Sequence, residues 1–250
     1  MIDLKNKTVL ITGASRGVGA AAAESCMKAG ARVLMHYGRD RKAAEAVAEK
    51  IGAKKSDLIE ADLNVPEHPA AVWAAALDRA HRIDVLVNNA GIFQATPVDG
   101  SDLEWVEGWR RTLQVNLLAP AHLCRAACAH FSGQGGGIII NVASRAGQRG
   151  DDIDHSAYAA SKGGLLALTK TIARGSGHKN VLAYGIAPGW IETRMGPQDI
   201  EARANAIKDI PLGRVASPEE IGDLIAYLST GTVPSMTGAT IDVNGASYVR

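Results

Sequence analysis

Short apolar runs alternate with longer alanine-rich segments along the chain, and this alternation predicts most of its secondary structure. The apolar runs are the expected strands, and they cover 8–11, 32–36, 57–61, 83–87, 138–142, 181–186 and 240–243. They are largely continuous, which is typical of strands that are buried on both faces of a sheet. The regular alternation of strand and helix therefore predicts an α/β fold, with a doubly wound parallel sheet in a three-layer α/β/α arrangement.

The segments between these strands carry helix start and stop signals. We expect helices over about 17–29, 41–51, 110–131 and 158–174, one opened by Pro66 and one beginning at Pro218. Asp40 and Ser217 are placed to cap two helices, and Gly30 is placed to end the first in a left-handed conformation. Because no linker or repeat divides the chain, we expect a single domain over 1–250. The segment 190–209 departs from the alternation, and we expect it to form a short lid over a ligand.

Composition excludes several classes of protein. The 250 residues carry 27 basic and 26 acidic side chains for a formal charge of +1, so the basic excess typical of nucleic-acid-binding proteins is missing. No apolar run approaches the roughly 20 residues that span a bilayer, and the polar start over 1–7 is unlike a signal peptide. We therefore expect a cytoplasmic protein without nucleic-acid or membrane partners.

The cysteines are Cys26, Cys124 and Cys128, and so odd and sparse a set argues against a disulfide framework. Cys124 and Cys128 stand four residues apart on an expected helix, a spacing that a zinc site could use. No further His or Cys clusters nearby, so we expect ordinary buried thiols and no metal.

The first expected strand leads into a glycine-rich turn, Thr12 to Gly19, that opens the first helix. Its GxxxGxG spacing differs from the usual GxGxxG fingerprint, but the physics is the same. Gly13 allows the turn out of the strand, while Gly17 and Gly19 let the backbone and the helix N-terminus approach a pyrophosphate. The turn predicts a dinucleotide site, and the alternative is a purely structural turn.

The end of the second strand bears on the choice of cofactor. An acid that binds the ribose 2′-hydroxyl usually stands about 20 residues beyond the glycines, but here the chain reads His36-Tyr37-Gly38-Arg39, and Asp40 is better explained as a helix cap. Arg16 and Arg39 could pair instead with a 2′-phosphate, which favours NADP over NAD. The alternative is two solvated surface arginines. Asp62 could accept a hydrogen bond from an adenine amino group, or serve only as a loop or capping residue.

A second group of candidate residues lies further along the chain. Tyr158 and Lys162 form a YxxxK motif whose spacing places both side chains on one face of a helix. The motif alone is weak evidence, but three other candidates accompany it. Ser144 follows the fifth expected strand, Asn88 to Gly91 follow the fourth, and Asn116 lies in the long expected helix. Each residue by itself is better interpreted as a turn or helix position. Their joint occurrence predicts a catalytic site.

Together these residues resemble the short-chain dehydrogenase/reductase family, in its single-domain branch, over essentially the whole chain. The resemblance rests on Thr12 to Gly19, Asp62, Asn88 to Gly91, Asn116, Ser144, Tyr158, Lys162, and Pro188-Gly189 followed by Thr193. Within the family the chain looks most like 3-oxoacyl-acyl-carrier-protein reductases and related ketone reductases. The resemblance implies a Rossmann fold, NADP (less readily NAD) as cofactor, and hydride transfer between nicotinamide and a ketone or secondary alcohol. It also implies a homotetramer or homodimer.

The resemblance further implies a role for each catalytic residue. Tyr158 is the general acid/base, Ser144 orients the substrate oxygen, Lys162 binds the nicotinamide ribose and lowers the pKa of Tyr158, and Asn116 supports a water in a proton relay. Bringing a tyrosine pKa from near 10 to about 7 requires about 4 kcal/mol, and one close cation in a poorly solvated site can supply much of it. The implied cofactor-binding residues are Gly13, Ser15, Arg16, Gly17, Val18, Gly19, Tyr37, Arg39, Asp62, Leu63, Asn89, Ala90, Gly91, Tyr158, Lys162, Pro188, Gly189, Ile191 and Thr193.

Several alternatives remain open at this stage. The interval between Ser144 and Tyr158 is rich in charge, which indicates either a sugar or polyol substrate or merely a solvated rim; its polar residues are Arg145, Arg149, Asp151, Asp152, Asp154 and His155. Trp190 could cover a substrate or pack the lid onto the body, and Trp105 and Trp109 could lie in a subunit contact. A sensor or scaffold that binds NADP without chemistry is the alternative from another functional class.

Overall fold

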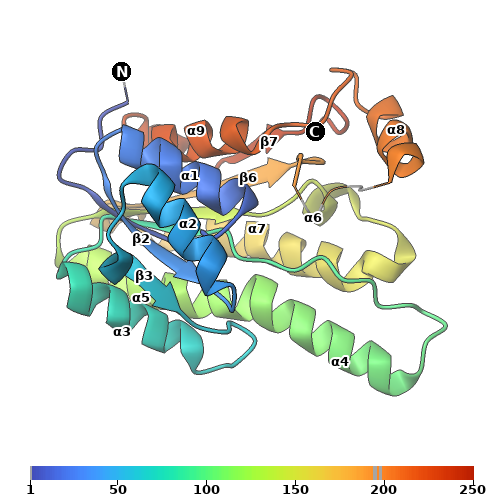
Figure 1. Cartoon of the computed structure of the whole chain (residues 1–250), viewed down its shortest axis with the longest axis horizontal. Helices are drawn as coiled ribbons and strands as arrows, with labels where there is room; N and C mark the ends of the chain where they lie inside the picture. Colours follow the sequence, from blue (N-terminus) through green and yellow to red (C-terminus); the bar gives the residue numbers. More distant parts are fainter. Residues whose placement is uncertain (1, 194–195, 197–198) are drawn as a thin grey trace.

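The computed structural model of the chain describes residues 2–193, 196 and 199–250. Within these residues, seven strands lie in one parallel sheet with the order β3-β2-β1-β4-β5-β6-β7 (Figure 1). Their bounds are β1 Thr8–Ile11, β2 Arg32–Tyr37, β3 Leu58–Glu60, β4 Val85–Asn88, β5 Gly137–Val142, β6 Val181–Pro188 and β7 Thr240–Val243. The predicted doubly wound parallel sheet is confirmed.

Helices cover both faces of this sheet. They are α1 Gly17–Lys28, α2 Arg41–Ile51, α3 His68–Ala80, α4 Asp102–Leu113, α5 Ala119–Gly133, α6 Ala146–Arg149, α7 Ser156–Ser176, α8 Ile200–Lys208 and α9 Pro218–Ser229. A π-helical turn, Gln114–Leu118, joins α4 to α5. Figure 1 shows α1 and α9 on one side of the sheet and α3, α4 and α5 on the other.

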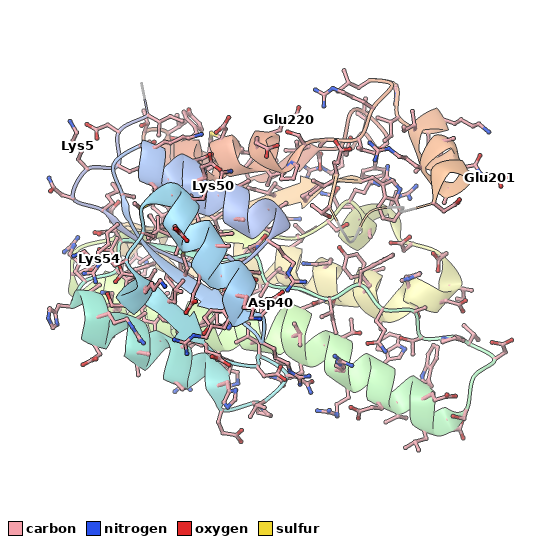
Figure 2. All side chains as sticks on the ribbon, viewed as in Figure 1. Lys5, Asp40, Lys50, Lys54, Glu201 and Glu220 are labelled. Atoms are coloured by element: carbon pink, nitrogen blue, oxygen red, sulfur yellow. The ribbon has the colours of Figure 1, made fainter. Side chains whose placement is uncertain are left out.

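Alternate residues of the central strands pack into two separate hydrophobic cores, one on each face of the sheet. In β1, Val9 and Ile11 pack with α1 and α9, whereas Leu10 packs with α3 and α5 on the opposite face. Both faces therefore require apolar side chains, which explains the continuous apolar runs of the sequence. Charged side chains such as Lys5 and Glu201 point outward (Figure 2).

The capping signals are confirmed, while two helix boundaries differ from expectation. The Asp40 side chain accepts a hydrogen bond from Ala43 N, and Ser217 forms a capping box with Glu220. The third helix begins at His68 rather than at Pro66, because Pro66 lies in a preceding turn and Pro69 takes the first-turn position that suits proline. The long helix starts at Asp102, earlier than the expected 110, behind a capping box of Ser101 and Glu104.

Within the described residues, no helix combines the length and the apolar character that crossing a membrane requires. In the same part of the chain, no three His, Cys, Asp or Glu side chains are grouped so that they could hold a metal ion. Cys26 and Cys124 are buried, and burial raises the pKa of each thiol to about 12. Such thiols stay protonated and unreactive at neutral pH.

Candidate active site

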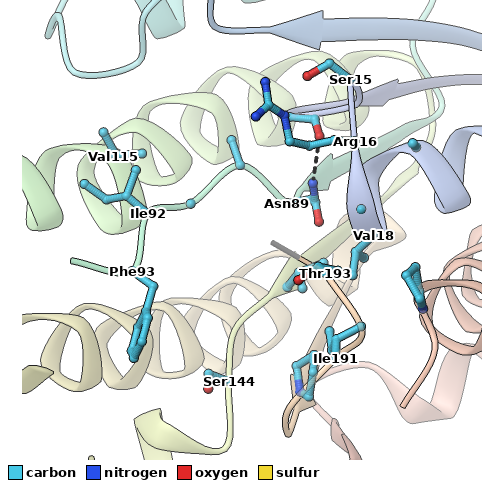
Figure 3. A pocket seen from close by; sticks show the side chains of 18 of the residues that line it. Ser15, Arg16, Val18, Asn89, Ile92, Phe93, Val115, Ser144, Ile191 and Thr193 are labelled. Atoms are coloured by element: carbon cyan, nitrogen blue, oxygen red, sulfur yellow. Dashed lines mark hydrogen bonds between the residues drawn. The ribbon is translucent and has the colours of Figure 1, made fainter. Parts of the chain in front are cut away.

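A cavity of about 1170 Å³ lies at the carboxyl ends of the central strands. Chain connections run in opposite directions from β1 and β4, and the crevice at such a switch point is the usual ligand site of an open α/β sheet. The structure brings most of the predicted residues together as its lining, namely Gly13, Ser15, Arg16, Gly17, Val18, Arg39, Asp62, Leu63, Asn89, Ala90, Gly91, Ser144, Tyr158, Lys162, Pro188, Gly189, Ile191 and Thr193 (Figure 3). Gly19, Tyr37 and Asn116 lie outside this lining.

The glycine-rich turn is held tightly against the end of β4. Gly13 has a φ of +68°, and a Cβ there would stand 2.9 Å from Ala90 Cα. Thr12 Oγ1 accepts hydrogen bonds from the backbone N–H groups of Asn89 and Ala90, each at 3.0 Å. A Cβ on Gly19 would lie 2.2 Å from the carbonyl oxygen of Gly13, so Gly19 packs beneath the turn instead of facing the cavity.

His36, at the end of β2, supports the same turn from the other side, and sequence reasoning did not select it. Gly13 N donates to His36 Nδ1 at 3.2 Å, and His36 Nε2 lies 3.0 Å from the carbonyl oxygen of Ala61. An amide donor at Nδ1 and a carbonyl acceptor at Nε2 together fix the neutral tautomer with the proton on Nε2. Burial lowers the pKa of His36 to about 4, so the ring is uncharged at neutral pH.

Side chains alternate along β2, and this alternation separates Tyr37 from the cavity that His36 lines. The Tyr37 hydroxyl donates to Glu60 Oε2 at 2.8 Å and lines a second, smaller pocket with Arg41 and Arg79. The structure thus does not bring Tyr37 together with the other predicted cofactor residues.

Ser144, Tyr158 and Lys162 meet at the opposite end of the cavity. Lys162 is buried, its Nζ donates to the carbonyl oxygen of Val142 at 2.9 Å, and this nitrogen lies 5.7 Å from the centroid of the Tyr158 ring. Ser144 Oγ accepts a hydrogen bond from Ala146 N at 3.1 Å, where α6 begins. Tyr158 and Lys162 share one face of α7, as the motif predicted.

Burial dominates the pKa values of this group. It raises the pKa of Tyr158 to about 12, an effect that the Ser144 hydroxyl opposes and the Asp151 carboxylate reinforces. Burial also lowers the pKa of Lys162 to about 8. The expected fall in the Tyr158 pKa is therefore not found in the protein alone, because the loss of hydration around the phenolate outweighs the hydrogen bond with Ser144.

Asn116 lies in the π turn and is fully buried. Its Oδ1 accepts from Ile92 N at 2.8 Å, and its Nδ2 donates to Ile92 O at 2.9 Å and to Ser161 Oγ at 3.2 Å. A π turn closes i→i+5 hydrogen bonds and is frequent at functional sites. Here the wide turn directs one amide side chain at the backbone beyond β4 and at the helix that carries Tyr158 and Lys162.

Comparison with known proteins decides how this cavity is interpreted. A family model described as short chain dehydrogenase matches residues 7–204. The chain belongs to the short-chain dehydrogenase family. It is 36% identical over 255 residues to 3beta-hydroxysteroid dehydrogenase 1 of Eggerthella lenta, covering 97% of this chain and 94% of that protein. It is 34% identical over 251 residues to a 3-oxoacyl-acyl-carrier-protein reductase of Vibrio cholerae, covering 99% and 100% of the two chains.

Structure comparison agrees. A dehydrogenase/reductase from Sinorhizobium meliloti superposes with a TM-score of 0.90 at 29% identity, over 99% of this chain and 97% of that chain. As a short-chain dehydrogenase of the 3-oxoacyl reductase-like type, the chain is an oxidoreductase that acts on CH–OH/C=O groups of a small-molecule substrate. Members of this family bind NAD or NADP, so the cavity is the place to seek a nicotinamide dinucleotide site.

An aromatic corner, formed by Phe93, His155, Tyr158 and Trp190, borders the Tyr158 end of this short-chain dehydrogenase cavity. Phe93 stacks on His155 with ring centroids 4.0 Å apart and an interplanar angle of 8°. It meets Tyr158 edge-on at 4.8 Å and Trp190 edge-on at 6.0 Å. Sequence reasoning selected Trp190 but not Phe93, because no local pattern marks a ring that is positioned by a residue far along the chain.

The charged interval before Tyr158 is divided between this corner, contacts to other loops and the wall of the cavity. Both carboxylate oxygens of Asp152 contact His155 Nδ1, at 2.7 and 2.9 Å. The Asp154 backbone oxygen accepts from Thr96 N at 2.7 Å, and its Oδ1 accepts from Val98 N at 3.2 Å. The Arg145 guanidinium contacts the hydroxyl of Ser247. Arg145, Arg149 and Asp151 line the cavity, so only part of the predicted polar rim faces it.

Proposed function

We propose that the chain is an NADP(H)-dependent oxidoreductase that interconverts a ketone and a secondary alcohol, with 3-oxoacyl compounds as the first substrate class to test. The observation that carries this proposal is the convergence of Ser144, Tyr158 and Lys162 on the cavity that also contains the glycine turn. A sensor that binds NADP without chemistry has no need of this arrangement.

The residues present fit a dinucleotide. The cavity runs from Arg16 and Arg39 at one end to Tyr158 at the other, and the position of a Cβ on Gly38 has nothing within 4 Å. We assign the pyrophosphate to the turn around Gly17, the 2′-phosphate to the two arginines, and the nicotinamide end to Pro188, Gly189, Ile191 and Thr193. When bound, the nicotinamide supplies or accepts the hydride.

The chain's own residues account for the proton. A Tyr158 pKa of about 12 keeps the phenol protonated at neutral pH, which is the state that donates to a carbonyl oxygen during reduction. We assign Ser144 to orient that oxygen by hydrogen bonding. Lys162, with a pKa of about 8, is largely charged at neutral pH and favours the phenolate that proton donation leaves behind. We interpret Asn116 as a positioning residue that fixes Ile92 and Ser161.

The test is NADPH oxidation over a panel of carbonyl compounds, with Tyr158→Phe as the control variant. We expect turnover by the natural chain and a loss of about 10²- to 10⁴-fold in the variant, with the NADPH Kd essentially kept. Equal turnover by both proteins would show that Tyr158 is not the proton donor. Tight NADPH binding without turnover on any compound would favour the sensor.

The aromatic corner supports a second substrate class, ketones and alcohols carried on a saturated ring. Phe93 and Trp190 provide flat apolar walls beside Tyr158, and one relative is named for a hydroxysteroid. The sugar or polyol alternative is weaker, since Asp152, Asp154 and His155 are engaged in loop contacts. The panel should therefore contain a 3-oxoacyl thioester, a cyclic ketone and a keto sugar, and the highest kcat/KM decides among them.

The remaining sequence-based expectations stand as proposals. We propose one domain over 1–250, with 190–209 as a lid; Arg203 of α8 pairs with Glu192 at 2.6 Å, while 194–195 and 197–198 lie outside the described residues. We also propose a cytoplasmic homotetramer or homodimer that uses α4, where Leu103 and Val106 are exposed and Trp105 lies beside Trp109. Light scattering of the purified chain tests the assembly.

A further inference from the structure

The end of the cavity assigned to the 2′-phosphate holds two guanidinium–carboxylate pairs. Arg16 Nη2 lies 2.8 Å from Asp40 Oδ2, and Arg39 Nη2 lies 2.7 Å from Asp62 Oδ2. All four residues line the same cavity, as does Gly38, where the position of a Cβ has nothing within 4 Å. Each arginine thus comes with its own counter-ion, so a 2′-phosphate does not meet two isolated positive charges.

In each pair the carboxylate is the fixed partner. Asp40 Oδ1 accepts the N-cap hydrogen bond from Ala43 N at 3.1 Å, and Figure 2 shows Asp40 at the start of α2. Asp62 Oδ1 accepts from Asn64 N at 3.0 Å. Among the described residues, the only side-chain hydrogen bond of Arg16 is the one to Asp40, and about half of its side chain is exposed. The guanidinium can therefore move away from its aspartate, whereas the aspartate is tied to the backbone.

We propose that Asp40 is a specificity-determining residue, whose carboxylate competes with the 2′-phosphate of NADP for the Arg16 guanidinium. Carboxylate and phosphate present the same acceptor geometry to the planar fork of arginine, so contact with one comes at the expense of the other. A ribose 2′-hydroxyl makes no such demand, and it can donate a hydrogen bond to Asp40. Asp40 consequently narrows the preference for NADP over NAD. This inference rests on the proposed binding of NADP.

The size of the effect follows from exposure. The Arg16 and Asp40 side chains are 49% and 42% exposed, and pairs of this kind attract each other only modestly. Removing the Asp40 charge should therefore tighten NADP⁺ binding by about two- to fivefold. The gain should shrink as salt is raised, because exposed charges are screened.

The experiment compares Asp40→Asn with the natural chain by calorimetric titration of NADP⁺ and NAD⁺. Asparagine caps a helix as well as aspartate does, so the substitution removes the charge and keeps the N-cap. We expect a lower Kd for NADP⁺ and a Kd for NAD⁺ that is unchanged or raised. Asp40→Ser, which also caps, must agree. Glu45→Gln is the matched control, because it takes the same charge from a guanidinium pair on the same helix, 2.9 Å from Arg41 and outside the cavity; it should change both Kd values by less than about twofold.

The Arg16→Gln variant distinguishes a failure of the proposed competition from a failure of the NADP assignment. If Asp40 acts through Arg16, adding Asp40→Asn to Arg16→Gln gives no further gain for NADP⁺, and a gain of the same size there overturns the competition. An unchanged NADP⁺ to NAD⁺ ratio in Asp40→Asn overturns the inference while the proposed function stands. If the natural chain binds NAD⁺ more tightly than NADP⁺ and Arg16→Gln leaves NADP⁺ binding unchanged, the NADP assignment itself fails.

Discussion

Replacing Lys162 by methionine should make the protein more stable while abolishing its activity. The ammonium is buried, and burial lowers its pKa from the ordinary 10.5 to about 8. That difference corresponds to about 3 kcal/mol by which the charged lysine destabilises the folded state at pH 7. Methionine has a similar length and no charge. It loses the hydrogen bond to Val142 O, which is worth about 1 kcal/mol, so the net gain is about 2 kcal/mol.

The size of this stability difference depends on pH. Below about pH 8 Lys162 is charged in both states, and the natural protein carries the whole desolvation cost. Between about 8 and 10.5 the unfolded chain holds a proton that the folded protein has lost, so the stability of the natural protein rises with pH. The advantage of Lys162→Met should therefore almost vanish near pH 10.

Urea denaturation at pH 7 and near pH 10 measures this difference, and thermal melting should show a rise in Tm of about 4–8 °C at pH 7. Lys170→Met is the matched control, since Lys170 is exposed on the same helix and should change the stability by less than about 0.5 kcal/mol. A Lys162→Met protein that is less stable at pH 7, or whose advantage is independent of pH, would refute the reasoning.

Three further predictions concern the turn, its supporting histidine and the tyrosine. Gly13→Ala should weaken NADP⁺ binding at least about tenfold in calorimetry, because its positive φ and the nearby Ala90 backbone both oppose a Cβ, while Gly133→Ala, with open space around it, should leave binding unchanged. Burial lowers the pKa of His36 to about 4, so the free energy of unfolding should fall by up to about 3 kcal/mol as the pH drops from about 6.5 to 4. Urea denaturation over this pH range measures the loss. A His36→Asn protein that loses the same stability over this range would contradict the prediction. Tyr158 should titrate with a pKa of about 12 in the protein alone, seen as the difference in phenolate absorbance from Tyr158→Phe, and a midpoint near 10 would contradict its burial.

The strands were predictable because their physical signal is strong. A strand buried on both faces must be apolar throughout, and β1, which fits this description, occupies its expected range. The edge strand β7 is only partly buried, and it also occupies its expected range. The glycine turn was predictable for a related reason, since Gly13 needs a positive φ that other residues avoid. Two helix starts were missed for different reasons. The start at Asp102 depends on a capping box that was not recognised. The start at His68 was misplaced because Pro66 and Pro69 both suit the first turn of a helix.

Contacts between distant segments could not be read from the sequence. That His36 rather than Tyr37 faces the cavity depends on which way the strand enters the sheet, and the apolar pattern around both residues is the same on either face. Phe93 is positioned by stacking on His155, a residue far from it in the sequence. The pKa of Tyr158 depends on how completely its surroundings exclude water, and neighbouring residues in the sequence do not determine that.

The π turn also sets the direction of the exposed face of α4 relative to the side of the helix from which Asn116 reaches Ile92. Because it holds one more residue than a turn of α-helix, it amounts to an insertion absorbed inside a continuous helical rod. Taking that residue out would rotate α4 by about 100° relative to α5. The exposed Leu103 and Val106 would then face a different direction, and Asn116 would lose its aim at Ile92. Evolutionary gain or loss of a single residue between α4 and α5 would therefore change two features at once. It would redirect the α4 surface proposed for assembly, and it would break the contact of Asn116 with Ile92.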